Sequence, residues 1–329
     1  MSSDTVVVMG EALVDAHLAP GVLRLHPGGG PFNTAVALAR LGVPTRFAGA
    51  ISRDRLGAEL RSRLVAAGVD TSAIVDVDAP TPLAVVAAEG VEPEYSFYLA
   101  GTAHELLDTR RLGRLGDAAA LHVGTLALAT DPPGEAVTAF AEQEAARRVL
   151  VLDPNVRPAL VSDRRAYVGR LERLVAVAEL VKLSEADLAW LYPETDTAAA
   201  VERLLEAGAG CVVVTSGSDG AAGWTRTTSA RARAPRVEVV DTVGAGDAFG
   251  AGLVAWLWWA GCLRKGELAR LGRDELGAAL RYAAAAGAAQ CTRASAWGPA
   301  AGDVERLLGD DLNDTREEGE VWQSSSSTG

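Results

Sequence analysis

Cysteine is scarce in this chain of 329 residues. The three that occur, Cys211, Cys262 and Cys291, lie far apart and show no C-x-x-C spacing. This distribution indicates neither a disulfide framework nor a zinc site, and the thiols are expected to be reduced and to pack in the core.

Positive charge is also in short supply, since 31 lysines and arginines stand against 43 aspartates and glutamates, for a formal net charge of −12. The lysines and arginines form no cluster along the sequence. Both observations argue against a nucleic-acid partner. They do not exclude nucleotide phosphates, because a few local amides and a metal ion suffice to bind them.

The sequence lacks an apolar run long enough to cross a bilayer, and no basic region precedes its first apolar segment, as a signal peptide would require. The most hydrophobic segment, 256–259, contains three tryptophans and is better explained by a buried helix. Hydrophobic residues make up 49% of the chain and charged residues 22%, which indicates a sizeable core. We therefore expect a cytoplasmic protein without a membrane partner.

Strand-like and helix-like segments alternate through most of the chain, which predicts an α/β fold with a doubly wound, mainly parallel sheet flanked by helices. Ligands of such sheets bind outside the carboxyl ends of the strands. The expected strands cover residues 6–9, 46–51, 120–126, 149–153, 180–183 and 211–215. Residues suited to a ligand site fall at or near predicted strand ends, namely Gly10, Gly124, Asp153, Ser184, Thr215 and Asp241.

The alternation breaks between residues 70 and 101. Three consecutive strands are expected there, at 72–77, 83–88 and 95–100, and hairpins between them would form a small antiparallel sheet. A surface meander without function is the alternative. The tail from residue 310 onward is polar and rich in serine, so disorder is expected for 310–329.

The segment from Val240 to Gly250, VDTVGAGDAFG, joins a phosphate-binding backbone to a carboxylate. A strand is expected over 236–240 and a buried helix over 248–259. Between them, Gly244 and Gly246 allow close approach of a ligand, and the helix start directs unpaired N–H groups and the positive end of its dipole outward. Asp247 would then be placed to accept a proton from an attacking hydroxyl. An ordinary helix cap is the alternative for this residue.

A second glycine-rich segment, PGGGPFNTAVALARLG, covers residues 27–42, and four further recognisable segments accompany it and the one just described. Together these six resemble the ribokinase-like (PfkB) carbohydrate kinases from about residue 9 to 293, and bacterial fructokinases in particular. The resemblance implies a kinase domain over 1–309, with a β lid drawn mainly from about 70–101 and part of 11–26. The other four segments are GEALVD (10–15), DPNVRP (153–158), KLSEAD (182–187) and TSGSDG (215–220).

The resemblance implies ATP- and Mg²⁺-dependent phosphorylation of a primary hydroxyl of a sugar. Asp247 would take the hydroxyl proton, and the amides of Gly244, Ala245 and Gly246 would form the anion hole. The implied sugar contacts are Asp15, Gly28, Gly29, Gly30, Asn33 and Arg157. Each of these residues also has a purely structural alternative. Asp15 could be a turn residue, the glycines at 28–30 a flexible loop, Asn33 an N-cap, and Arg157 the partner of Asp153 in a salt bridge.

Two departures from the family pattern affect the nucleotide site. The usual Asn-x-x-Glu appears as Ser184 to Asp187, which can order water around Mg²⁺ but also fits a helix cap. Ala284 replaces a frequently polar residue beside the adenine, so packing would hold the base. Asp153 is a second candidate for metal-bound water, and Asp241 for a monovalent cation such as K⁺. The implied nucleotide contacts are Ser184, Thr215, Gly217, Gly220, Gly246 and Ala284, although an ordinary turn also explains Thr215 to Gly220.

The sequence fits proteins of other functional classes less well. The G-x-G-x-x-A match at 250–255 falls inside the apolar helix, not after a strand, which argues against a nicotinamide-dependent oxidoreductase. No P-loop motif is present. A non-catalytic sugar or nucleotide sensor is disfavoured by the presence of Asp247. We expect a neutral ketohexose such as fructose as the acceptor, with 2-keto-3-deoxygluconate, another sugar or a nucleoside as alternatives, and a homodimer as the oligomeric state.

Overall fold

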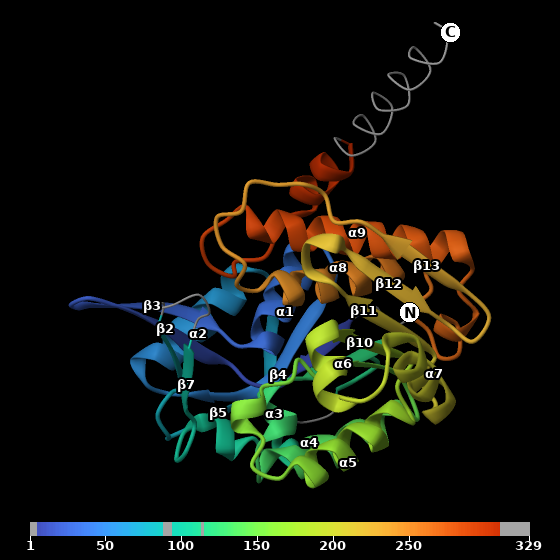
Figure 1. Cartoon of the computed structure of the whole chain (residues 1–329). Coiled ribbons are helices and arrows are strands. Elements are labelled where there is room, and N and C mark those ends of the chain that lie inside the picture. Colours follow the sequence, from blue (N-terminus) through green and yellow to red (C-terminus); the bar gives the residue numbers. More distant parts are fainter. Residues whose placement is uncertain (1–4, 88–93, 113–114, 310–329) are drawn as a thin grey trace, which may run out of the picture.

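The computed structural model describes residues 5–87, 94–112 and 115–309, which form a large sheet, a smaller sheet and the helices around them (Figure 1). The tail at 310–329, for which disorder is expected, lies outside the described residues. None of the helices in the described ranges is long and apolar enough to span a membrane.

The large sheet has nine strands in the order β13-β12-β11-β10-β9-β8-β1-β4-β5. Its first seven strands along the chain pair in parallel, and only β12 and β13 run antiparallel at one edge. The doubly wound, mainly parallel α/β fold expected from the sequence is thus confirmed. The strands are β1 (Val6–Met9), β4 (Thr45–Ser52), β5 (Asp70–Val77), β8 (Ala120–Gly124), β9 (Val149–Asp153), β10 (Leu180–Ser184), β11 (Cys211–Thr215), β12 (Ala221–Trp224) and β13 (Ser229–Ala232).

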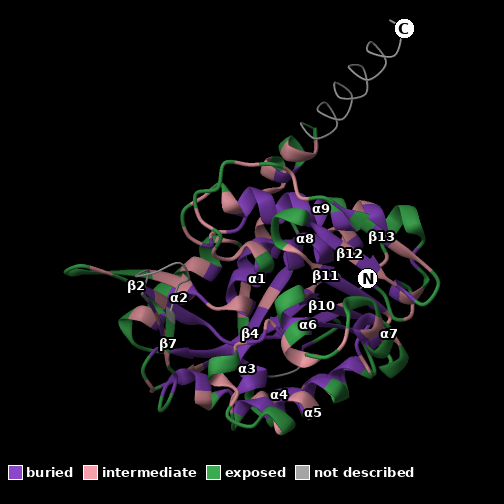
Figure 2. Ribbon diagram, in the orientation of Figure 1, coloured by how far each residue is buried: buried purple, intermediate pink, exposed green. Residues whose placement is uncertain are grey.

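Helices cover both faces of this sheet, because its central strands bury alternate side chains on opposite sides. In β1, Val6 and Val8 belong to one core and Val7 and Met9 to the other. The first face packs against α1 (Gly30–Arg40), α2 (Arg55–Ala66), α8 (Ala245–Trp259) and α9 (Arg273–Cys291). The second packs against α3 (Leu126–Ala129), α4 (Pro133–Ala145), α5 (Arg164–Val175), α6 (Glu185–Leu191) and α7 (Thr197–Ala207). Figure 2 shows the buried strands between these two layers.

The smaller sheet has the strand order β3-β2-β6-β7 and projects to one side of the large sheet (Figure 1). Its strands are β2 (Leu13–Ala19), β3 (Val22–Gly28), β6 (Leu83–Ala87) and β7 (Glu94–Tyr98). The β2–β3 and β6–β7 pairs are antiparallel, as expected of the lid, while β2 and β6 run parallel.

The membership of this small sheet corrects one expectation. The segment 72–77 is not part of it, because β5 pairs in parallel with β4 at the edge of the large sheet. The hairpin at 13–28 supplies two strands in its place. The reason is burial: Ala73, Val75 and Val77 alternate inward and join the core of the large sheet.

The strand expected over 236–240 is also wrong, since residues 233–239 have no regular secondary structure. The β-branched residues there do not enter a sheet: Val239 and Val240 are 58% and 61% exposed. The helix expected from residue 248 begins earlier, at Ala245.

Candidate active site

Polar and glycine residues gather at the carboxyl edge of the large sheet, as the strand pattern predicted. Asp153 pairs in register with Gly124, and Ser184 with Thr215, so the strands end level within each of these two neighbouring pairs. Asp241 is the exception, because it lies in a loop and not at a strand end. Its carboxylate accepts hydrogen bonds from the N–H groups of Val243, at 3.0 Å, and Ser295, at 3.3 Å.

The glycine loop leads directly into α8. Gly244 is the N-cap residue, with φ +78°, and a Cβ there would come within 2.7 Å of the Ala296 side chain. No side chain caps the first turn of α8, so those of its N–H groups that the loop does not engage are available to an anion. The amide of Ala245, which was expected in the anion hole, is instead engaged within the loop, since it donates to Thr242 O at 3.2 Å.

Asp247 lies in that first turn and points to α1. Its Oδ2 accepts a hydrogen bond from Asn33 Nδ2 at 2.9 Å, across 214 residues of sequence. The structure therefore does not support the alternatives in which Asp247 or Asn33 is a helix cap: the N-cap of α1 is Gly29. Burial raises the pKa of Asp247 to about 6, although the hydrogen bond from Asn33 lowers it. The carboxylate is thus ionised at neutral pH and poised to accept a proton.

The three glycines at 28–30 lie against polar groups. A Cβ on Gly28 would collide with the Asp15 carboxylate. A Cβ on Gly30 would lie 2.6 Å from Thr125 Oγ1, 3.4 Å from Asn155 Nδ2 and 3.5 Å from Asp247 Oδ1. Gly28 ends β3 and Gly30 begins α1, so they are fixed in regular elements, not in the flexible loop considered as the alternative. They leave room where a hydroxyl, an amide and two carboxylates converge.

The Asp15 side chain faces the same space, and the charge of Asp247 affects its pKa. Burial raises the pKa of Asp15 to about 7, the charge of Asp247 raises it further, and Arg157 opposes both. The Arg157 guanidinium also acts on the carboxylates of Asp247 and Asp153, and its expected contact with the substrate stays a prediction. Its Nη1 donates to Asn155 Oδ1 at 2.7 Å.

The alternative salt bridge between Asp153 and Arg157 is wrong. Asp153 instead pairs with Lys182, at 2.9 Å between Oδ2 and Nζ, and both side chains are buried. Asn155, which lies between Asp153 and Arg157 in the sequence, has φ +41°, so the backbone there is not continuously extended.

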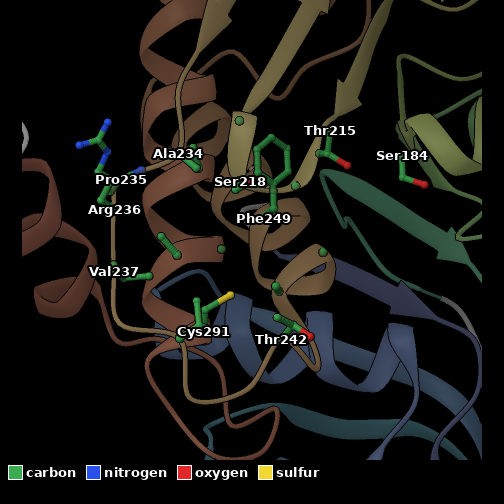
Figure 3. A pocket seen from close by; sticks show the side chains of 18 residues that line it. Ser184, Thr215, Ser218, Ala234, Pro235, Arg236, Val237, Thr242, Phe249 and Cys291 are labelled. Atoms are coloured by element: carbon green, nitrogen blue, oxygen red, sulfur yellow. The ribbon is translucent and has the colours of Figure 1, made fainter. Parts of the chain in front are cut away.

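All six expected nucleotide contacts line one cavity of about 560 Å³ (Figure 3). Ser184 and Thr215 lie at the strand ends on one side, with Gly246 at the start of α8. Ala284 lies on α9, and the other lining residues include Phe249 and a mostly apolar wall from the irregular segment 234–239, which also contributes Arg236. A nucleotide would place its phosphates at the α8 terminus and its base against this wall. The six are Ser184, Thr215, Gly217, Gly220, Gly246 and Ala284.

Ser184 and Asp187 form a helix cap, which is the alternative to a role in ordering water around Mg²⁺. The Ser184 side chain accepts from Asp187 N at 3.1 Å, and Asp187 Oδ2 accepts from Ser184 N at 2.8 Å. Asp187 Oδ1 accepts from Val156 N at 2.7 Å. Because both carboxylate oxygens of Asp187 already have protein donors, its contact with metal-bound water stays a prediction.

A hydrated Mg²⁺ fits this edge better at Asp153. The Oδ1 atom of Asp153 is buried and has no hydrogen-bond partner among the described residues. Within the ranges that the structure describes, no group of three or more His, Cys, Asp or Glu side chains could hold a metal ion without other ligands. This is the situation in which Mg²⁺ is held by one or two carboxylates together with phosphate oxygens and water.

Sequence reasoning missed Glu11, Thr125 and Lys182. Glu11 Oε2 accepts from the amides of Leu126 and Ala127, at 3.1 and 3.3 Å, and so fixes the turn that carries Thr125. Burial raises the pKa of Glu11 to about 8. Glu11 lies in the segment 10–15 and Lys182 in the segment 182–187. Thr125 belongs to none of the six segments, and only its closeness to Gly30 in the structure identifies it.

The chain matches the pfkB family carbohydrate kinase model over residues 4–300. It is 39% identical over 277 residues to a fructokinase of Rhizobium leguminosarum bv. trifolii, covering 82% of this chain and 85% of that protein. The fold is similar to a fructokinase from Xylella fastidiosa with bound ATP (TM-score 0.87, 29% identity, 94% of this chain and 99% of that one). It is also similar to a Vibrio cholerae O395 fructokinase with fructose, ADP and calcium ion bound (TM-score 0.82, 26% identity, 94% and 100% covered).

Proposed function

The chain belongs to the pfkB family of carbohydrate kinases, and we propose that within this family it is a fructokinase that transfers the γ-phosphoryl group of ATP to a primary hydroxyl of fructose. That it is a sugar kinase, a phosphotransferase with an alcohol group as acceptor, follows from the family and from its fructokinase relatives.

The observation that carries the proposal is the position of Asp247 between two spaces. Its Oδ1 faces the glycine-lined space at Gly30, and the adjacent Gly246 lines the nucleotide cavity. A hydroxyl held beside Gly30 would give its proton to Asp247 as its oxygen attacks the phosphoryl group. The free N–H groups of the first turn of α8 would stabilise charge that develops on the phosphoryl oxygens. Bound Mg²⁺ would neutralise charge on the nucleotide phosphates.

Charge in the acceptor space favours a neutral sugar. Among the described residues, Asp15 and Asp247 face it together with the guanidinium of Arg157, which also donates to Asn155. A carboxylate substrate would have to leave water next to two acidic groups and compete with them for that cation. Sugar hydroxyls, in contrast, can donate to the carboxylates and accept from Asn155.

We expect kcat/KM to be highest for fructose when fructose, ribose, 2-keto-3-deoxygluconate and adenosine are compared under identical conditions with Mg²⁺ and ATP. A coupled assay of ADP release measures all four. A preference for the sugar acid or the nucleoside would refute fructose as the acceptor and leave the kinase assignment intact. Sugar and ATP binding without turnover of any acceptor would instead favour the sensor.

We also propose that two copies associate through the small sheet. Its hairpin exposes Leu18, Val22, Leu23 and Leu25, each 45–51% accessible, and β3 forms an edge that can accept another strand (Figure 2). We expect a dimer in sedimentation equilibrium, and a monomer for Leu23→Lys. A monomeric parent protein would contradict the proposal. Leu106→Lys, at an exposed leucine outside the small sheet, is the control.

A cytoplasmic location and a monovalent cation at Asp241 stay predictions from the sequence. For the cation, the Asp241 carboxylate accepts two backbone hydrogen bonds at the base of the glycine loop, so a bound K⁺ would act on that loop. A dependence of kcat on K⁺ at constant ionic strength tests it.

A further inference from the structure

Lys182 is a buried lysine that the mechanism above does not use. It lies in β10, and its side chain is 6% exposed. Its Nζ contacts Asp153 Oδ2 at 2.9 Å, and the Asp153 side chain is 5% exposed. Replacing such a buried pair by apolar side chains is often neutral or stabilising, so stability alone does not account for it.

The ion pair lies directly beneath the first turns of α8. A Cβ on Gly246 would be 3.5 Å from Lys182 Nζ, and a Cβ on Gly250 would be 3.6 Å from Asp153 Oδ2. These glycines are four residues apart and so lie on one face of the helix. Their missing side chains bring the ammonium group close to the backbone of Gly246, which lines the nucleotide cavity.

Lys182 is surrounded by acidic groups. The carboxylates of Asp153, Asp187 and Asp247 all act electrostatically on it. A nucleotide polyphosphate would enter next to these carboxylates, and repulsion would oppose its approach to the glycine loop. The ammonium group places a positive charge on the sheet side of that loop, and it is shielded from solvent, so its effect is weakly screened.

We propose that Lys182 is a positioning residue for phosphoryl transfer: its buried charge holds Asp153 and counteracts the surrounding carboxylates, so that the polyphosphate can settle on the start of α8. The inference rests on the proposed function, because it assumes that nucleotide phosphates bind there.

The first test replaces Lys182 with methionine, which keeps much of the length and removes the charge. We expect kcat to fall roughly 10²-fold, as for the loss of one group that stabilises transition-state charge, with KM for fructose changed less than about threefold. Lys265→Met is the matched control, since Lys265 pairs with Glu179 at 2.8 Å but lies outside the site. It should leave both constants unchanged.

The second test separates this role from simple support of Asp153. Lys182→Met leaves Asp153 buried and unpaired, which by itself destabilises the fold. We therefore compare Asp153→Asn with the Asp153→Asn/Lys182→Met double variant, in which both charges are removed and unfolding is measured alongside. ATP affinity is measured by calorimetry with Mg²⁺ and without sugar.

We expect the double variant to bind ATP at least tenfold more weakly than Asp153→Asn, despite equal or higher thermal stability. Equal ATP affinity of the two variants would show that Lys182 only neutralises Asp153, and would overturn the inference. Failure of the parent protein to bind ATP would instead refute the proposed function, so the two failures are distinguishable.

Discussion

Asp247→Asn is expected to lower kcat by about 10²–10⁴-fold, the contribution of a positioned general base, while ATP affinity changes little. Asparagine has nearly the same shape, and no helix cap is lost, because Asp247 does not cap α8. The measurement is kcat with fructose at saturating ATP. Asp196→Asn is the control, since Asp196 caps α7 through Ala199 N and asparagine caps equally well. Near-parental kcat in Asp247→Asn would mean that another group takes the proton.

The same carboxylate should set the acid side of the pH profile. Because burial raises the pKa of Asp247 to about 6, kcat/KM should fall as pH drops through about 6 and the base becomes protonated.

The stability of the folded state, in contrast to kcat/KM, should rise as pH falls. The pKa of Asp247 in the folded state lies above its ordinary value of 3.8, so the folded state binds the proton more tightly, and unfolding becomes harder as pH falls from about 6 to about 4. Asp247→Asn should therefore melt at a higher temperature than the parent at pH 8 and lose this advantage near pH 4. An unchanged difference in Tm across this range would contradict the raised pKa.

Gly30→Ala should lower kcat/KM for fructose by roughly 10²-fold, since displacement of reacting groups by about 1 Å has effects of this size. The new methyl group would lie 2.6 Å from Thr125 Oγ1, forcing that side chain to rotate, and would fill the space beside Asn155 and Asp247. Gly30 does not have a positive φ and begins α1, so alanine is compatible with its backbone.

ATP affinity in the absence of sugar should stay at the parental value in Gly30→Ala, because the nucleotide cavity is lined by other residues. Gly169→Ala, in α5 with open space around it, is the matched control and should change neither quantity. An unaltered KM and kcat for fructose in Gly30→Ala would place the acceptor elsewhere.

The sequence alone was sufficient for six of the nine strands of the large sheet, all of them parallel, and for the motif positions around them; these strands are β1, β4, β8, β9, β10 and β11. Buried β-branched strands alternate with helices, and the hydrophobic period and short connections that define them are local properties of the chain. The rule that ligands bind at the carboxyl ends of parallel strands then places Asp153, Ser184 and Thr215 together. Five of the six expected nucleotide contacts likewise fall in short motifs, and all six line one cavity.

Only the tertiary structure decided the partners of the charged and polar side chains. Asp247 is hydrogen-bonded to Asn33 across 214 residues, and Asp153 pairs with Lys182 of the neighbouring strand, not with nearby Arg157. The same holds for β5, which resembles the lid strands in sequence but joins the large sheet because its alternate side chains complete that core. Local pattern fixes the type and order of elements, whereas these contacts depend on which surfaces pack together. That choice is made by burial over the whole chain, and no short window of sequence contains it.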